Sequence, residues 1–258
     1  RPGLVFPLFR HGGPREDALD GAAVADRNHP LDHRAPDAPA SSTRNPLAAK
    51  TLKGDGVFYL VATGKTVRLR GSNFIRLAKQ PHPGGSTVTY HSTFDPTEWD
   101  AVGAEKALEK MHQDGYNFVR VFLNGLRVGN STTGVGVDPN YIANVKAFLA
   151  LARKHNVYVY LTFPFWLNAN YPYKNTNPQV SGYHGFYLTK AGVAARQQMI
   201  EHILKALLAG GAPLQQVVAY DLMNEGHFRE DQLPLSLSKG SVTTFLGTYD
   251  MGSTAQRN

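Results

Sequence analysis

The stretch DPNYIANVKAFLALARKHNVYVYLTF, residues 138–163, contains a helix and a strand in immediate succession. Asp138 followed by Pro139 is typical of a helix start, because aspartate caps free backbone N–H groups and proline fits the first turn. Apolar residues then recur at the spacing of one helical face, namely Tyr141, Val145, Phe148, Leu149 and Ala152. His155-Asn156 indicates the end of the helix, and the apolar run 157–163 predicts a buried strand.

The same alternation extends to both sides of this stretch. Before it, Asp95-Pro96-Thr97-Glu98 predicts a helix start, Gly115 a helix end, and residues 117–123 a strand. After it, residues 189–209 predict a helix and residues 217–223 a fourth strand. The expected buried positions are Ala104, Ala107, Leu108 and Met111 in the first helix and Val193, Ile200, Ile203, Leu204, Leu207 and Leu208 in the third. Upstream, residues 57–61 and 67–74 read as two further β runs.

The connections indicate the fold class. Each helix-to-strand link is short, whereas the strand-to-helix segments 76–94, 124–137 and 164–188 are long. Long loops gathered at the C-terminal ends of parallel strands favour an α/β fold, a (β/α)8 TIM barrel of which about the first four βα units are present. A doubly wound open sheet is the alternative. Gly134-Val135-Gly136 lacks the third glycine of a phosphate loop, which disfavours a nucleotide-binding domain.

The composition of the chain excludes several kinds of site and partner. The chain has 258 residues, a formal net charge of +7 and no cysteine, which excludes disulfides, a thiolate nucleophile and cysteine-ligated zinc. Its basic residues are scattered, so we expect no nucleic-acid partner, and no apolar run is long enough to span a membrane. Residues 1–50 predict a disordered or linker-like segment, and residues 51–258 the folded domain. His11, His29 and His33 lack the spacing of metal ligands, and we expect neither a metal nor a cofactor.

Glu225 is the strongest candidate for chemistry, since it follows the fourth predicted strand beside Asn224. A carboxylic acid at a strand end can protonate the leaving oxygen of a glycosidic bond, and a neighbouring amide can bind a sugar hydroxyl. The alternative is that Glu225 only closes a loop.

Arg120 is a charged residue inside an otherwise apolar strand. If its side chain points into the barrel, it needs a carboxylate partner near the site, because a buried unpaired charge is costly. The alternation of the strand also allows it to point outward.

The segment 164–188 is rich in aromatic and amide side chains, among them Trp166, Tyr171, Asn168 and Asn170. Sugar rings stack their C–H faces on aromatic planes, and Trp166 is the candidate platform. The alternative is that these aromatic residues pack the loop against the barrel.

Three motifs in order resemble glycoside hydrolase family 5 and its relatives in clan A, over about residues 54–228. They are Gly64-Lys65-Thr66-Val67-Arg68-Leu69-Arg70-Gly71-Ser72-Asn73, Gly115-Tyr116-Asn117-Phe118-Val119-Arg120 and Asp221-Leu222-Met223-Asn224-Glu225. The resemblance implies a retaining hydrolase of β-linked oligo- or polysaccharides that is secreted. It makes Glu225 the acid/base, lets Asn224 hold the sugar 2-hydroxyl, has Arg120 orient the nucleophile, and adds Asn73 as a substrate contact.

The chain departs from this family pattern in one respect. The family's nucleophile is a second glutamate after a seventh strand, and Glu230 and Asp231 lie too close to the fourth strand to take that place. We therefore expect an N-terminal half truncated before the nucleophile, inactive alone and prone to associate through open sheet edges. The non-enzymatic alternative is a carbohydrate-binding fragment or inactive relative that uses the aromatic loop.

Overall fold

The structure is a computed structural model that describes residues 46–81, 85–125, 127–129, 136–164, 184–225 and 229–257. Strand β1 (Leu47–Leu52) begins inside the segment 1–50, for which the sequence predicts no regular structure. Residues 1–45 of that segment lie outside the described residues.

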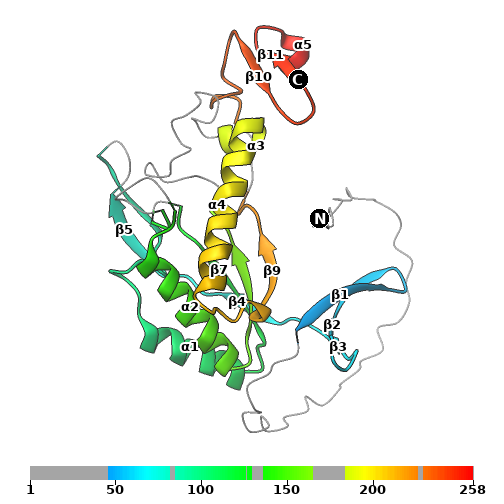
Figure 1. The fold of residues 1–258 in the computed structure, drawn as a ribbon, viewed down its shortest axis with the longest axis vertical. Helices are drawn as coiled ribbons and strands as arrows, with labels where there is room; N and C mark the ends of the chain where they lie inside the picture. Colours follow the sequence, from blue (N-terminus) through cyan, green and yellow to red (C-terminus); the bar gives the residue numbers. More distant parts are fainter. Residues whose placement is uncertain are drawn as a thin grey trace, which may run out of the picture. The chain divides into compact units, whose positions relative to one another are not determined.

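A four-stranded parallel sheet is the centre of the fold (Figure 1). Its strands are β4 (Gly71–Asn73), β7 (Phe118–Phe122), β8 (Tyr158–Thr162) and β9 (Val217–Asp221). They lie in the order in which they occur along the chain, each parallel to its neighbour. A doubly wound sheet reverses its order at a switch point, and these four strands show no reversal. The βα order and the parallel sheet are thus as predicted, and closure into a barrel stays a prediction.

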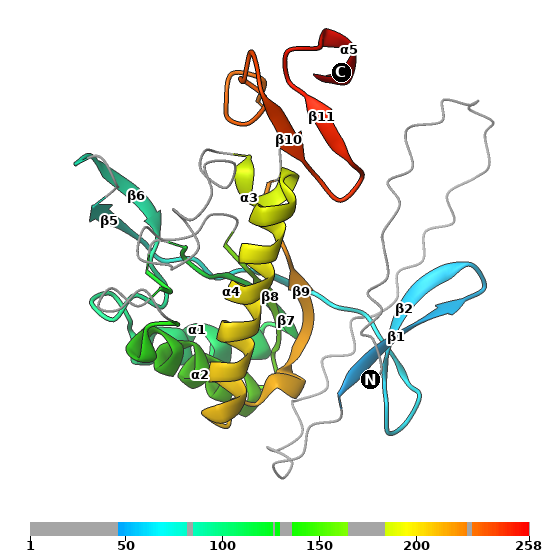
Figure 2. The same ribbon diagram turned by 45° about the horizontal axis from the view of Figure 1, so that its top comes forward.

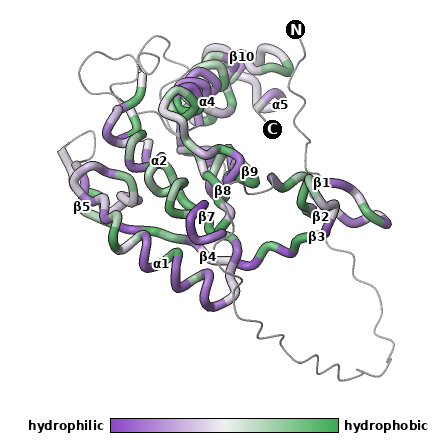
Figure 3. Tube along the Cα trace, turned by 60° about the horizontal axis from the view of Figure 1, so that its bottom comes forward, coloured by the Kyte–Doolittle hydropathy of each residue, from purple (hydrophilic) through white to green (hydrophobic). Residues whose placement is uncertain are grey.

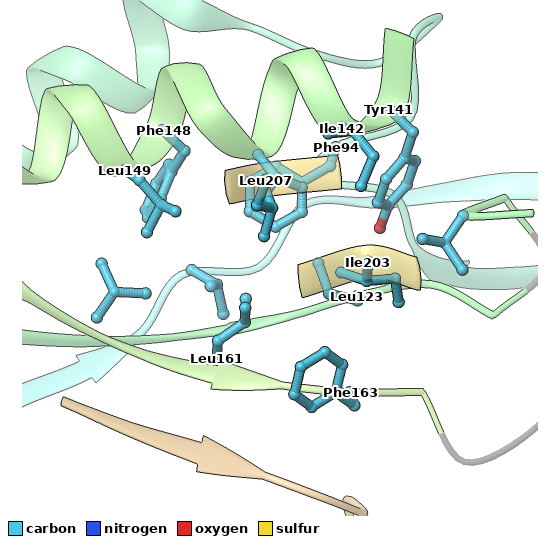
Figure 4. Close-up of a cluster of buried hydrophobic side chains, with 14 of the residues drawn as sticks. Phe94, Leu123, Tyr141, Ile142, Phe148, Leu149, Leu161, Phe163, Ile203 and Leu207 are labelled. Carbon is cyan, nitrogen blue, oxygen red and sulfur yellow. The ribbon is translucent and has the colours of Figure 1, made fainter. Parts of the chain in front are cut away.

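Three helices connect these strands and cover one face of the sheet: α1 (Ala101–Gln113), α2 (Pro139–Lys154) and α4 (Lys190–Ala209). Helix α2 packs against both α1 and α4 (Figure 2). Between α2, α4 and the sheet lies a buried apolar cluster that includes Phe148, Leu161 and Ile203 (Figure 4). Burying each such side chain stabilises the fold by about 1.5–3 kcal/mol, so this cluster is what holds the sheet to its helices.

Helix α2 begins and ends as predicted. The Asp138 carboxylate accepts from the backbone N–H groups of Asn140 and Tyr141, and every residue of the predicted stripe is buried. Asn156, just beyond the helix, has a φ of 57°, in the left-handed region typical of a chain that leaves a helix.

Two helix predictions need correction. Helix α1 begins at Ala101 with Asp100 as its cap, not at Asp95-Pro96, because the Asp95 carboxylate accepts from Thr97 instead and forms a separate turn. In α4, Leu208 is 62% exposed, although the sequence places it on the buried face with Leu207. The buried face of α4 runs through Ala195, Met199, Ile203 and Leu207, a spacing of three to four residues that excludes position 208.

The predicted β run 67–74 is two strands. Strand β3 (Thr66–Val67) pairs antiparallel with β2 (Asp55–Leu60), which also pairs with β1, whereas β4 joins the parallel sheet. The side chain of Asn117 bridges the interruption: its Nδ2 donates to the Arg68 carbonyl at 3.0 Å and its Oδ1 accepts from Arg70 N at 2.9 Å.

A hairpin occupies the predicted long loop 76–94. Its strands are β5 (Leu77–Pro81) and β6 (Thr87–His91), which pair antiparallel from Leu77–His91 to Pro81–Thr87. The remaining elements are the short helices α3 (Gly185–Leu188), η2 (Leu214–Gln216) and α5 (Thr254–Arg257), and the hairpin of β10 (Ser241–Thr243) and β11 (Thr248–Asp250). Hydrophobic and hydrophilic residues alternate along α1 and α4 (Figure 3). Among the described helices, none combines the length and apolar character needed to cross a membrane.

Candidate active site

Arg120 lies in the middle of β7, and its side chain is on the sheet face opposite the helices. Its neighbours Val119 and Val121 are fully buried in the core, and the strand alternation turns Arg120 away from them. Its Nη2 forms an ion pair with the carboxylate of Asp221, the last residue of β9. The Arg120 and Asp221 side chains are 24% and 14% exposed, so this pair is mostly shielded from solvent. The carboxylate partner that an inward-pointing Arg120 requires is therefore Asp221.

Further contacts hold the guanidinium of Arg120 in place. Its Nε donates to Thr162 Oγ1 at 3.0 Å, and Thr162 in turn donates to Asp221 Oδ2 at 3.1 Å. Its Cζ lies 4.5 Å from the ring centroid of Phe122 and 5.4 Å from that of Tyr160, within the range of cation–π attraction. Contacts with four side chains thus fix the Arg120 cation near the C-terminal ends of the parallel strands. These side chains are Thr162, Asp221, Phe122 and Tyr160.

Asn224 extends this cluster beyond β9. Its Oδ1 lies 3.0 Å from Arg120 Nη2. A guanidinium has only donors, so the atom that faces it is the amide oxygen, and the NH₂ group of Asn224 is left to donate elsewhere. The Asp221 side chain also accepts from the backbone N–H of Met223 at 3.2 Å, which fixes the turn that leads to Asn224.

Glu225 follows in this turn and is exposed. Its φ is 49°, in the left-handed region that costs a non-glycine residue of the order of 1 kcal/mol. A strained carboxylate-bearing residue in the turn after a strand is the kind of outlier that accompanies functional sites.

Asn73, the last residue of β4, is the register partner of Arg120, so the parallel pairing brings the two predicted site residues side by side. The Arg120 carbonyl also accepts from Phe74 N at 2.9 Å, which secures the end of β4 against β7. Asn73 is exposed at this end of the sheet.

His91, at the end of β6, is a member of the site that the sequence did not single out. Its ring packs edge-on against Phe122, with centroids 4.6 Å apart. Partial burial lowers its pKa from the ordinary 6.5, the Glu225 carboxylate raises this pKa, and the Arg120 guanidinium lowers it. His91 therefore lies within electrostatic reach of both the candidate acid and the central cation.

A buried polar network supports this edge of the site. Asn124, two residues after the end of β7, donates from Nδ2 to Gln80 Oε1 and to the His91 carbonyl, each at 2.7 Å. Gln80 Nε2 donates to Ser92 Oγ at 2.6 Å, and the Tyr141 hydroxyl accepts from Asn124 N at 2.8 Å. Gln80, Ser92 and Asn124 are at most 1% exposed, so these bonds are shielded from competing water.

The structure thus brings Asn73, Arg120, Asn224 and Glu225 to one end of the sheet. Trp166, the predicted sugar platform, lies outside the described residues. Sequence reasoning missed Asp221, Thr162 and His91; the polar ends of the apolar strands 158–162 and 217–221 were the available signal for the first two. Among the described residues, no group of three or more His, Asp or Glu side chains is placed to hold a metal ion.

No protein-family model matches the chain, and no curated protein matches it. Among solved structures it is similar to an exo-β-1,4-mannosidase from an Opitutaceae bacterium, with 17% identity and a TM-score of 0.46 over 68% of this chain and 28% of that one. It is also similar to a β-mannanase from the blue mussel Mytilus edulis, with 19% identity and a TM-score of 0.44 over 72% of this chain and 46% of that one.

A third similar structure is a GH5_18 protein from Bifidobacterium longum in complex with Manβ1-4GlcNAc, with 18% identity and a TM-score of 0.34 over 46% of this chain and 28% of that one. The chain thus covers less than half the length of each of these solved chains.

Proposed function

We propose that the chain carries the acid/base side of a glycoside hydrolase site that acts on β-linked oligo- or polysaccharides by a retaining mechanism. The observation that supports this most is the cluster in which Arg120 joins Asp221 to Asn224, one residue before the strained and exposed Glu225. It combines a rigid cation, an amide with donors to spare and a carboxyl group at the end of parallel strands, where such folds place their sites.

Each residue takes a chemical role in this proposal. Glu225 protonates the leaving glycosidic oxygen and then activates the incoming water. Asn224, whose oxygen is occupied by Arg120, donates its NH₂ hydrogens to the sugar 2-hydroxyl, an interaction that strengthens in the transition state. Asn73 and Trp166 contact the sugar.

The nucleophile is a second carboxylate that Arg120 orients. Asp221 does not take this role in the proposal, because its Oδ2 is engaged by both Arg120 and Thr162. The described contacts of Arg120 use Nε and Nη2, and we assign Nη1 to the second carboxylate. Retaining chemistry needs two carboxyl groups about 5–5.5 Å apart. Among the described residues, Asp221 is the only carboxylate bonded to Arg120, so we expect the purified chain to bind β-linked sugars without hydrolysing them.

Calorimetry on the purified chain tests the sugar-binding part. The probes are β-1,4-linked hexasaccharides of glucose and of mannose, with the α-1,4-linked hexasaccharide of glucose as the control. We expect binding of at least one β-linked probe, none of the α-linked one, and a loss of about fivefold in affinity in Asn224→Ala, the effect of one hydrogen bond. A chain that binds neither β-linked probe contradicts the proposal.

Product analysis of the same mixtures tests the catalytic part. No products are expected from the wild-type chain. Products that disappear in Glu225→Gln would support Glu225 as the acid/base but show that the nucleophile lies within these residues. Products that persist in Glu225→Gln would contradict the role of Glu225.

A further inference from the structure

His91 reaches the candidate site from outside the parallel sheet. It is the last residue of β6, and its strand belongs to the hairpin between β4 and α1. Its electrostatic partners, Glu225 and Arg120, come from the turn after β9 and from β7. Three separate segments therefore bring His91, Glu225 and Arg120 within electrostatic reach of one another.

The contacts that hold the His91 imidazole in place do not involve its two ring nitrogens. Its ring rests edge-on against Phe122 at an interplanar angle of 86°, and it lies tilted by 31° against the Tyr90 ring at a centroid distance of 4.8 Å. The hydrogen bond from Asn124 Nδ2 ends on the backbone carbonyl of His91, not on the ring. Aromatic packing and a clamped backbone thus orient a polar ring, which is how binding sites pre-organise a side chain that meets a ligand.

The Phe122 ring links His91 to the central cation. One part of this ring meets the imidazole and the Arg120 guanidinium lies over it, so His91 and Arg120 have positions fixed by the same side chain. Phe122 itself is 5% exposed and cannot move without disturbing the strand. A sugar that reaches Glu225 beside Arg120 therefore meets an imidazole at a fixed position.

The charge state of His91 suits contact with a hydroxyl group. Because burial and Arg120 lower its pKa, His91 is neutral around pH 7, with one nitrogen that donates and one that accepts. A sugar hydroxyl both donates and accepts, so a neutral imidazole can pair with it in either direction. A protonated ring would only donate and would compete for the Glu225 carboxylate.

We propose that His91 is a substrate-contacting residue that hydrogen-bonds a hydroxyl of the β-linked sugar bound beside Glu225. This inference rests on the proposed function and adds the β5–β6 hairpin to the site. It makes the hairpin a determinant of which sugars bind, because the imidazole selects a hydroxyl at one position of the ring.

Calorimetry with variants of His91 tests this contact, using whichever β-1,4-linked hexasaccharide, of glucose or of mannose, the wild-type chain binds more tightly. His91→Phe keeps a ring against Phe122 but has no nitrogens, and we expect about fivefold weaker binding, the loss of one hydrogen bond. His91→Gln restores a donor and an acceptor, and we expect it to regain most of the affinity. Thr87→Ala, at the other end of the same strand, is the matched control and should bind as the wild type does.

An NMR titration gives an answer that does not depend on how the variants fold. The His91 ring signal, assigned by its absence from His91→Gln, should shift on saturation with the sugar, while that of His112 on α1 should stay in place. A wild-type chain that binds the sugar with an unmoved His91 signal overturns this inference alone, as does unchanged binding by a folded His91→Phe. A wild-type chain that binds neither β-linked hexasaccharide overturns the proposed function and this inference with it.

Discussion

At the residue scale, Arg120 and Asp221 depend on each other. Arg120→Met leaves the mostly buried Asp221 carboxylate without its cation, and we expect the free energy of unfolding to fall by about 2–3 kcal/mol. Adding Asp221→Asn to this variant should recover part of the loss, because the uncompensated charge is gone. Urea unfolding measures both values. The exposed pair Lys110–Asp114 is the comparison: Lys110→Met should leave the unfolding midpoint unchanged, since solvent-exposed pairs contribute little. An equal loss of stability in Arg120→Met and Lys110→Met would contradict the description of Arg120–Asp221 as a shielded ion pair.

A second prediction for a single residue concerns His91 and the pH dependence of the free energy of unfolding. Its pKa is lower in the folded chain than the ordinary 6.5, chiefly through burial and against the effect of Glu225. The unfolded chain therefore binds a proton first as the pH falls below about 6.5, and the free energy of unfolding falls with it until the pH passes the folded pKa. Urea unfolding from pH 5 to 8 should show a slope that is smaller in His91→Gln. An identical slope in that variant would exclude this residue as its source.

The sequence predicted some of these residues and not others, for a physical reason. Glu225, Asn224 and Arg120 stand out because each is a polar residue at a position where a strand pattern expects an apolar one or has just ended. His91 belongs to a segment with no such pattern, and only the hairpin brings it beside Phe122. A residue whose role depends on long-range folding of a connecting segment gives no local signal.

At the scale of elements, β4 can approach β7 only because Gly71 has no side chain. A Cβ at this position would lie 1.8 Å from the Phe118 carbonyl oxygen, which belongs to the backbone of the neighbouring strand and cannot move aside. We expect Gly71→Ala to lower the free energy of unfolding by at least about 2 kcal/mol, as overpacking does. Gly56→Ala in β2 is the control, because a Cβ there meets nothing within 4 Å. A tolerated Gly71→Ala would show that β4 does not pair with β7 as described.

The elements also show where sequence patterns suffice. Helix α2 is predicted from cap to end because its capping aspartate, apolar stripe and left-handed exit residue agree with one another. The start of α1 is misplaced because Asp95-Pro96 has the local features of a cap, whereas Asp95 is drawn into the buried network and an ion pair with Arg127 at 2.9 Å. Local sequence propensity determines where a helix begins only when tertiary contacts do not compete for the capping side chain.

At the scale of the whole molecule, the described sheet ends in two strands with one neighbour each, β4 and β9. Large apolar side chains are exposed on β9, directly after it and on α4, with Tyr220 at 38%, Leu222 at 53% and Leu208 at 62%. An open parallel edge flanked by apolar residues associates with other chains. We expect concentration-dependent self-association in sedimentation velocity, reduced in Leu208→Lys/Leu222→Lys. The variant Val61→Lys, at a 51% exposed position beyond β2, is the control that should associate as the wild type does. A chain that stays monomeric at all concentrations would contradict this prediction.

The β5–β6 hairpin is fastened by buried hydrogen bonds of Gln80, near the end of β5, to Ser92, which follows β6, and to Asn124, which follows β7. Its strands are paired up to Pro81 and Thr87, on either side of the turn. The turn of this hairpin is consequently a suitable segment to exchange in protein engineering. The turn can be lengthened or replaced, while the bonds of Gln80, Ser92 and Asn124 keep the end of β6 and His91 in place. Libraries randomised over this turn would leave the bonds of Gln80, Ser92 and Asn124 in place and show whether the turn affects which sugars the proposed site binds.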